Sequence, residues 1–181
     1  MQQQQQQSGF TLIELIIVIV ILGILAVTAA PKFIDIQGDA TASTLKGVRG
    51  ALQGGSQLVY AKSAIASEQR NADTTLTTGG QVVPTIFGYP AAKATVVTTT
   101  TNLTGWVDIG TDFTLVVGTV SGSTPTEIAP VEGTFAIKPA GGNPTIDYRV
   151  TAEGGLSCHV LYTESSAVGV APLIVAVTGG C

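Results

Sequence analysis

Three kinds of residue in this 181-residue chain could do chemistry: a carboxylate inside an apolar run, a pair of cysteines and a histidine. Glu14 is the one charged residue between positions 10 and 30, in the stretch FTLIELIIVIVILGILAVTAA. An ionisable group inside an apolar segment is costly, so it is a functional-site candidate by default. A carboxylate in an apolar assembly needs a cationic or hydrogen-bonding partner. The sequence therefore predicts that Glu14 pairs with another group.

The apolar run has the length of a membrane-spanning helix. Its 21 residues would form a helix of roughly 31 Å, against about 30 Å for a bilayer core. A cleaved secretory signal has a shorter apolar region, about 7–15 residues, after a basic start. Residues 1–9 instead consist of Met1, six glutamines, Ser8 and Gly9. A plain membrane anchor fits the length but leaves Glu14 unexplained.

The start of the apolar run carries a resemblance to a known family. Gly9-Phe10-Thr11-Leu12-Ile13-Glu14, followed by an unbroken apolar helix, resembles the class III signal of type IV pilins and pseudopilins. Residues 26–60, AVTAAPKFIDIQGDATASTLKGVRGALQGGSQLVY, are similar to the mannose-sensitive haemagglutinin (MSHA) branch of type IV pilins. The close resemblance covers roughly the first third of the chain, and the rest matches in general organisation, including two late cysteines.

The resemblance implies how the first residues are processed. A prepilin peptidase would cut after Gly9, remove residues 1–9 as a leader and methylate the new N-terminal residue, Phe10. In the filament, Glu14 would then meet the Phe10 amine of a neighbouring subunit. Two alternatives remain: a pair between Glu14 and Phe10 within one helix, four residues apart, and a glutamate that is tolerated near the membrane interface.

The resemblance also implies a weak point and an orientation for the helix. Gly23 and Pro31 stand where the family places helix-weakening residues, so the helix is expected to melt between them in a strained filament. Proline lacks a backbone N–H and clashes with the carbonyl four residues earlier. Residues 1–9 contain no Lys or Arg, so the positive-inside rule does not support an external globular domain; that orientation is implied by the resemblance alone.

An amphipathic helix half is predicted over residues 32–67, where no proline occurs. Joined to the hydrophobic polymerisation segment at residues 10–31, it gives one helix over about residues 10–67. The non-polar arc of the second half is about 220° wide, against about 100° for an ordinary surface helix, so a partner besides one sheet is expected. The first face contains Leu45, Val48, Leu52, Val59 and Ala66, and the adjoining arc contains Gly47, Gly50, Ala51, Gly54, Leu58 and Ile65.

Gly47, Gly50 and Gly54 form a stripe of small residues on that adjoining arc. Each glycine inside a helix costs roughly 1 kcal/mol relative to alanine, so the stripe requires an explanation. Small residues let another backbone approach closely. The two alternatives are another subunit and the protein's own sheet, and in both we expect the stripe to be covered.

Residues 68–181 predict a globular β domain. Residues 68–105 are rich in Thr, Gly and Ala and are interpreted as a long loop with one or two short strands, at residues 82–83 and 95–100. The stronger strand signals downstream have short turns between them, which favours an antiparallel meander. The predicted class is α+β, the type IV pilin fold, with the sheet packed on residues 32–67. Those signals lie at residues 105–109, 112–120, 133–138, 145–151, 156–163 and 169–177.

Cys158 and Cys181 are the two cysteines of the chain. In an externally displayed domain, two cysteines usually pair. The bond would close the region 158–181 and contribute about 3–4 kcal/mol on the chain-entropy model. The alternative is a catalytic thiol beside His159, but consecutive strand residues point to opposite faces, whereas a Cys–His pair needs them side by side. The sequence therefore predicts a structural disulfide and no enzyme.

The composition excludes several other classes. Charged residues make up 11% of the chain and the net charge is −4, against about 25% charged in ordinary domains. The eight Lys and Arg residues are spread along the chain and supply no basic patch for nucleic acid. With one histidine, and with Asp108 and Asp112 lacking the acidic spacing of a calcium loop, no metal or cofactor site is predicted.

The predicted function is the structural major subunit of an MSHA-like type IV pilus. The resemblance implies an inner-membrane precursor, a surface filament on a Gram-negative bacterium, and roles in adhesion and biofilm formation. It implies four partners: copies of the chain, the prepilin peptidase, an extension ATPase and an inner-membrane platform. One alternative is a type II secretion pseudopilin, which the Thr-rich loop and late cysteines disfavour. Another is a membrane-tethered module that binds host or surface glycans through Tyr89, Trp106, Tyr148 and Tyr162.

Overall fold

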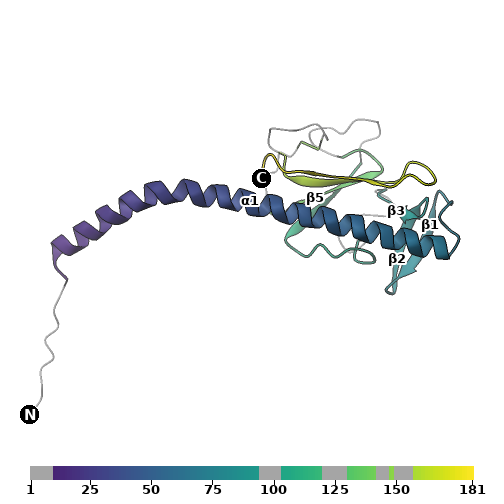
Figure 1. Cartoon of the computed structure of the whole chain (residues 1–181), viewed down its shortest axis with the longest axis horizontal. Coiled ribbons are helices and arrows are strands. Elements are labelled where there is room, and N and C mark those ends of the chain that lie inside the picture. Colours follow the sequence, from purple (N-terminus) through teal and green to yellow (C-terminus); the bar gives the residue numbers. More distant parts are fainter. Residues whose placement is uncertain (1–9, 94–102, 120–129, 142–146, 149–156) are drawn as a thin grey trace, which may run out of the picture. The chain divides into compact units, whose positions relative to one another are not determined.

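The computed structural model describes residues 10–93, 103–119, 130–141, 147–148 and 157–181, with the backbone alone at residues 34 and 35. The chain divides into two compact units, Met1–Gly38 and Asp39–Cys181. One helix, α1, spans Leu12–Ile65 and contributes to both units. All the described strands belong to Asp39–Cys181 (Figure 1).

The helix predicted over residues 10–67 is confirmed as α1, Leu12–Ile65. It begins two residues later because Thr11 caps its first turn rather than joining it. It ends two residues earlier because Ser67 adopts a positive φ of 59°. The backbone N–H of Ser67 then donates to the carbonyl of Ala64, and that of Glu68 donates to Ser63. This pair of bonds is a Schellman-type end, with serine in the place that glycine usually takes.

The strands form two antiparallel sheets. The first sheet has the order β1 (Thr74–Thr78), β2 (Gln81–Ile86), β3 (Tyr89–Pro90). The second has the order β4 (Phe113–Val117), β5 (Thr134–Pro139), β6 (His159–Thr163), β7 (Leu173–Val177). Each neighbouring pair in the second sheet is antiparallel and consecutive, so the predicted meander and the α+β class are confirmed.

The first sheet corrects the interpretation of residues 68–105 as mainly a loop. Residues 82–83 lie within β2, as predicted, but β2 is longer and pairs with β1 on one side and β3 on the other. The turn between β1 and β2 consists of Gly79 and Gly80, both with positive φ. Such a glycine pair gives a two-residue hairpin turn whose twist matches its strands. Residues 95–100 lie outside the described residues.

The strand predicted at residues 105–109 is wrong. The backbone N–H groups of Trp106 and Val107 both donate to the carbonyl of Leu103, so the chain turns there instead of extending. Strands within residues 112–120, 133–138, 156–163 and 169–177 are confirmed in their described parts, as β4 to β7. Residues 145–151 lie largely outside the described residues, and residues 147–148 are not in a strand.

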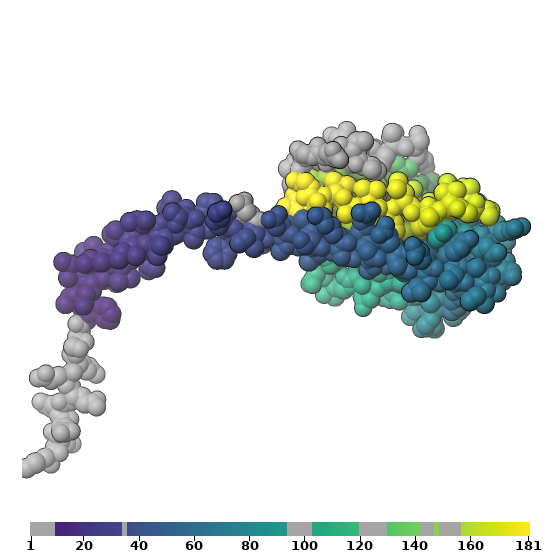
Figure 2. Space-filling model, viewed as in Figure 1, coloured from purple at the N-terminus to yellow at the C-terminus, as the bar shows by residue number. Residues whose placement is uncertain are grey.

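The main core lies between α1 and the second sheet. The buried side chains of Leu45, Val48 and Leu52 pack there with side chains from β5, β6 and β7. A second cluster joins Val59 of α1 to Leu76 and Val83 of the first sheet. Trp106 packs against both clusters. Figure 2 shows the C-terminal strands lying along the part of α1 that belongs to Asp39–Cys181.

Candidate functional site: the helix start, the exposed helix faces and the disulfide-closed region

The start of α1 is a hydrogen-bonded capping box. The backbone N–H of Thr11 donates to Glu14 Oε2 at 2.9 Å, and its hydroxyl donates to the same oxygen at 2.6 Å. The backbone N–H of Glu14 in turn lies 3.4 Å from Thr11 Oγ1. Two free donors of the first turn are thereby satisfied reciprocally. Thr11 was missed by the sequence analysis, although Thr-x-x-Glu before an apolar run is the signature of such a box.

The bonds at the helix start bear on the predicted partners of Glu14. The hydrogen bonds of its carboxylate go to Thr11, the residue next to Phe10. Phe10 precedes the helix, and its side chain is 88% exposed. Gly9 lies outside the described residues. The pairing of Glu14 with the Phe10 amine of a neighbouring subunit therefore stays a prediction, and before cleavage the carboxylate already has a partner in its own chain.

The first half of α1 presents an uncovered apolar surface in the single chain. Every large apolar side chain from Phe10 to Val27 is exposed. Among the described residues, α1 is long and apolar enough to cross a membrane by length and composition. Burying apolar area is the dominant favourable term in association, so a membrane or a second protein surface must cover this segment.

Gly23 and Pro31 both lie inside α1, which is continuous through them in the single chain. An added Cβ at Gly23 would meet nothing within 4 Å, so no close contact among described residues requires the glycine there. Pro31 cannot donate to the carbonyl of Val27, which leaves one bond missing from the helix. The melting of this segment in a filament stays a prediction.

The second half of α1 is covered on one face alone. The predicted face is buried at Leu45, Val48, Leu52 and Val59, whereas Ala66 lies beyond the helix and is exposed. Gly55, which the sequence analysis did not single out, is the closely packed glycine: an added Cβ would lie 2.5 Å from the carbonyl oxygen of Trp106.

A side-chain hydrogen bond also joins α1 to the second sheet: Arg49 Nε donates to the carbonyl of Ile174 in β7 at 3.2 Å.

The predicted glycine stripe is open in the single chain. An added Cβ at Gly47, Gly50 or Gly54 would meet no atom within 4 Å. Leu58, on the same arc, is 73% exposed, and Ile65 is also exposed. Within the described residues, the alternative in which the protein's own sheet covers the stripe is therefore wrong. A cover supplied by another subunit stays a prediction.

Cys158 and Cys181 are joined in a disulfide, with their Cα atoms 4.9 Å apart. The bond links Cys158, the residue before β6, to Cys181, which lies beyond the end of β7. The two strands β6 and β7 are antiparallel neighbours. The backbone N–H of Gly180 donates to the carbonyl of Ser157 at 3.0 Å and reinforces the closure. Since both sulfur atoms are bonded to each other, the alternative of a catalytic thiol is wrong.

His159 is fully buried beside that disulfide. Neither ring nitrogen has a hydrogen-bond partner among the described residues, and the ring of Tyr148 lies 5.2 Å away, centroid to centroid. Burial lowers the pKa of His159 to about 4, while the negative charge of Asp147 opposes the shift. His159 is therefore a neutral core residue at pH 7.

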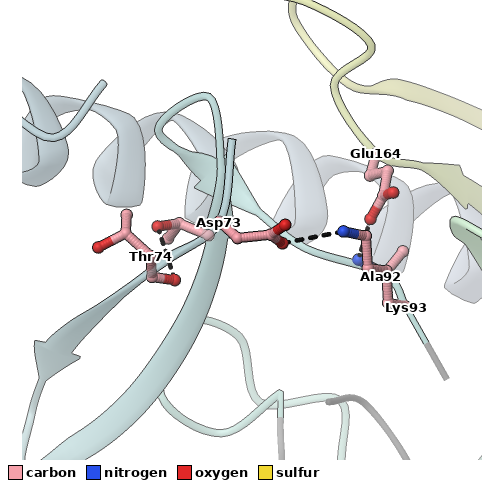
Figure 3. A network of polar contacts seen from close by, with 6 residues as sticks. Asp73, Thr74, Ala92, Lys93 and Glu164 are labelled. Carbon is pink, nitrogen blue, oxygen red and sulfur yellow. Dashed lines mark hydrogen bonds and ion pairs between the residues drawn. The ribbon is translucent and has the colours of Figure 1, made fainter. Parts of the chain in front are cut away.

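Two hydrogen bonds tie β6 and its end to β3 and the chain that follows it. The backbone N–H of Ala92 donates to Glu164 Oε2 at 2.7 Å, next to the ion pair between Lys93 and Asp73 at 2.9 Å (Figure 3). Burial raises the pKa of Glu164, although the Ala92 bond opposes this. The hydroxyl of Tyr162 donates to the carbonyl of Pro90 at 2.7 Å. These bonds fasten the two sheets together.

The aromatic residues proposed to stack on glycans are mostly used inside the protein. Tyr162 is buried and stacked on Phe135, with ring centroids 4.6 Å apart. Tyr148 is also buried. Tyr89 stacks on Tyr60, with centroids 4.4 Å apart. Trp106 is partly buried and lines a cavity beside Gly55 and Leu58 of α1.

Comparisons with known proteins place these features in a family context. Residues 4–30 match the prokaryotic N-terminal methylation motif. The fimbrial protein EcpC of Eikenella corrodens is 33% identical over 103 residues, which cover 56% of this chain and 67% of that protein. The type II secretion system core protein G of Pseudomonas aeruginosa is 49% identical over 45 residues, which cover 25% of this chain and 32% of that protein. No solved structure matches the chain.

Proposed function

We propose that this chain, which belongs to the type IV pilin-like proteins, is the major structural subunit of a type IV pilus of MSHA type. Its relatives are structural subunits of the pilin and pseudopilin kind. The assignment as a major pilin for surface adhesion and biofilm formation is supported by the resemblance of residues 26–60 to the MSHA branch. A structural subunit of this kind has no enzymatic activity.

One observation carries the proposal: an apolar helix half that is uncovered in the single chain and has a carboxylate in its first turn. The methylation motif, residues 4–30, overlaps this half of the helix. Cleavage after Gly9 would give Phe10 a free α-amino group, and a filament would bring it to the Glu14 carboxylate of another copy. Pairing of two otherwise isolated charges in an apolar core favours one register of packing.

Assembly is proposed to proceed in two stages. The precursor is first inserted in the inner membrane, which α1 spans, and the processed chain is then added to an extracellular helical homopolymer. The prepilin peptidase, the extension ATPase and the inner-membrane platform are the proposed partners, and a Gram-negative surface is the proposed location. The fimbrial relative and the exposed apolar run support the two stages.

The second candidate is a type II secretion pseudopilin. It is favoured by the high identity of 45 residues to a type II secretion system core protein. The alignment with the fimbrial protein extends further along this chain, over 103 residues, and the Thr-rich loop and the Cys158–Cys181 disulfide favour a pilin. Deleting the chain separates the candidates: loss of surface fibres supports the pilin, and loss of protein secretion with intact fibres rejects it.

Mass spectrometry of sheared surface fibres tests the main claim. We expect a peptide that begins with methylated Phe10 and lacks residues 1–9. Intact residues 1–9 in surface material would overturn the proposal. A companion variant, Glu14→Ala, should strongly reduce assembly while the Cys158–Cys181 disulfide still forms, because the disulfide lies in the other compact unit. Normal fibre yield from Glu14→Ala would reject the role of the carboxylate.

A further inference from the structure

The outer strands of the two sheets are β1, β3, β4 and β7, and side chains occupy the outer edges of three of them. In an antiparallel pair, the backbone groups of alternate residues point away from the neighbouring strand. On β1 the outward carbonyl of Thr77 accepts a hydrogen bond from Lys62 Nζ. On β7 the outward carbonyl of Ile174 accepts one from Arg49 Nε. On β3 the carbonyl of the last residue accepts one from the Tyr162 hydroxyl.

The outer edge of β4 differs from these three. The N–H of Gly118 donates to the carbonyl of Thr134, which fixes the residues of the β4 segment that bond to β5. By alternation, the backbone groups of Phe113, Leu115 and Val117 point away from β5. Among the residues that the structure describes, none donates to or accepts from these outward groups. The β4 edge is therefore an unpaired row of backbone donors and acceptors.

The side chains of β4 agree with an open edge. Phe113, Leu115 and Val117 are partly exposed, whereas Phe135 and Ile137, opposite them on β5, are fully buried. The strand reads FTLVV and contains neither a charged residue nor a proline. Proteins usually protect such an edge with lysine, proline or a covering element. An apolar edge without this protection is a template on which another strand can pair.

We propose that two copies of this chain pair through their β4 edges, antiparallel, with Leu115 opposite Leu115 of the second copy. In this register Phe113 lies opposite Val117, so each outward residue meets an outward residue and exchanges two hydrogen bonds with it. Asp112 then faces Gly118 of the second copy, so no two carboxylates are opposed. A shift by two residues leaves one outward residue of each β4 without a partner. This self-complementarity, together with the absence of charge, favours a second copy as the occupant.

The pairing goes beyond the proposed function and does not rest on it. The same surface is used on both copies, so the contact closes after two chains. A helical homopolymer instead needs contacts between two different surfaces. The β4 contact therefore cannot extend a fibre, and between assembled subunits it would join one fibre to another.

Hydrogen exchange of the β4 amides tests the pairing in the full chain. The protein is kept in a non-ionic detergent with more micelles than chains, so that the apolar half of α1 does not force association. We expect the outward amides of Phe113, Leu115 and Val117 to exchange about tenfold or more slowly at high than at low protein concentration. The amides of Thr114 and Val116, which bond to β5, should be protected at both concentrations.

Two matched lysine variants separate the β4 edge from general surface effects. Thr114 is exposed, and in the proposed pair it lies diagonally about 7–8 Å from Thr114 of the second copy. Thr114→Lys would bring two positive charges together there and should abolish the concentration dependence. Thr75→Lys places the same charge at an exposed threonine of β1, in the other sheet, and should leave it unchanged.

Cysteine cross-linking tests the register. Thr114 would lie opposite Val116 of the second copy, where opposed Cβ atoms are about 4.5–5.5 Å apart. Under mild oxidation, Thr114→Cys chains should link to Val116→Cys chains in a mixture, and neither variant should link to itself. Four results would overturn the proposal: fast exchange of the outward amides at every concentration, slow exchange independent of concentration (a segment of the same chain then occupies the edge), an unaffected Thr114→Lys variant, or equal self-linking.

Discussion

Glu14 combines two demands on a single carboxylate. In the single chain it closes the capping box with Thr11 and satisfies donors of the first helical turn. In the proposed filament it would also accept a hydrogen bond from the positively charged α-amino group of a neighbouring subunit. A carboxylate has two oxygens with about four acceptor sites, and both hydrogen bonds from Thr11 use Oε2. Oε1 is thus the oxygen that the proposed intersubunit pair would use.

His159 makes a pH-dependent prediction at the same scale. Its folded pKa is about 4, while an unfolded histidine titrates near 6.5. Between about pH 6.5 and pH 4 the imidazole is therefore protonated in the unfolded state and neutral in the folded state. The free energy of unfolding should therefore fall between these values, by up to about 3 kcal/mol from this residue, and level off below them. Chemical denaturation at a series of pH values measures the effect.

The chain offers a direct control for this prediction, because His159 is its one histidine. NMR titration of the imidazole Cε1–H should show a neutral ring in the folded protein down to near pH 4. A midpoint near 6.5 would contradict the assignment. A His159→Gln variant that folds should lose the pH dependence attributed to the imidazole and keep that of the carboxylates.

At the scale of elements, the second half of α1 has one face that is buried in the protein core and one face that is exposed in the single chain. The buried face was predictable, because Leu45, Val48, Leu52 and Val59 recur at heptad-like spacing and all four are buried. The function of the glycines was not predictable in the same way. Gly55 carries the close approach inside the protein, whereas Gly47, Gly50 and Gly54 meet nothing within the described residues. Sequence spacing can identify a stripe of glycines. It cannot identify the glycine that Trp106 packs against, because the position of Trp106 depends on tertiary structure.

Two substitutions on this helix separate the two kinds of glycine. Gly55→Ala should destabilise the folded unit by about 1–3 kcal/mol, because the new methyl group would collide with the Trp106 carbonyl. Gly50→Ala should stabilise it by about 0.5–1 kcal/mol through helix propensity alone. Urea denaturation of both variants measures the difference. Similar effects of the two substitutions would contradict the packing at Gly55.

Gly50→Ala has a second use in the filament. If another subunit approaches the stripe closely, this stabilising substitution should reduce fibre yield even though the monomer is more stable. Unchanged fibres would remove the intersubunit function of the stripe.

The first sheet was mostly missed from the sequence, although its hairpin carries a recognisable signal. Gly79-Gly80 lies between two β-prone runs, a pattern typical of a two-residue hairpin turn. The strand predicted at residues 105–109 failed for another reason: alternating apolar residues are compatible with a strand, but Trp106 and Val107 bond back to Leu103. Local hydrogen bonds to Leu103 therefore formed a turn in place of the strand that the alternating apolar pattern predicted.

For the whole molecule, low charge is the property most relevant to assembly. Charged residues make up 11% of the chain, and the described residues show one side-chain ion pair, Lys93 with Asp73. Contacts between neutral surfaces are insensitive to ionic screening. We expect sheared fibres to change in stability by less than about twofold between low salt and about 1 M salt. Dissociation at high salt, followed by light scattering, would contradict this.

Trp106 also determines how the globular unit comes apart. The first sheet is small and its cluster consists of Val59, Leu76 and Val83, with Trp106 packed against it and against the main core alike. Neither sheet can lose its partner without exposing that indole. Unfolding of Asp39–Cys181 is therefore expected to be all-or-none, with amides of β2 and β5 exchanging at the same free energy. Together with the Ala92–Glu164 and Tyr162–Pro90 hydrogen bonds, this side chain makes the two sheets a single cooperative unit.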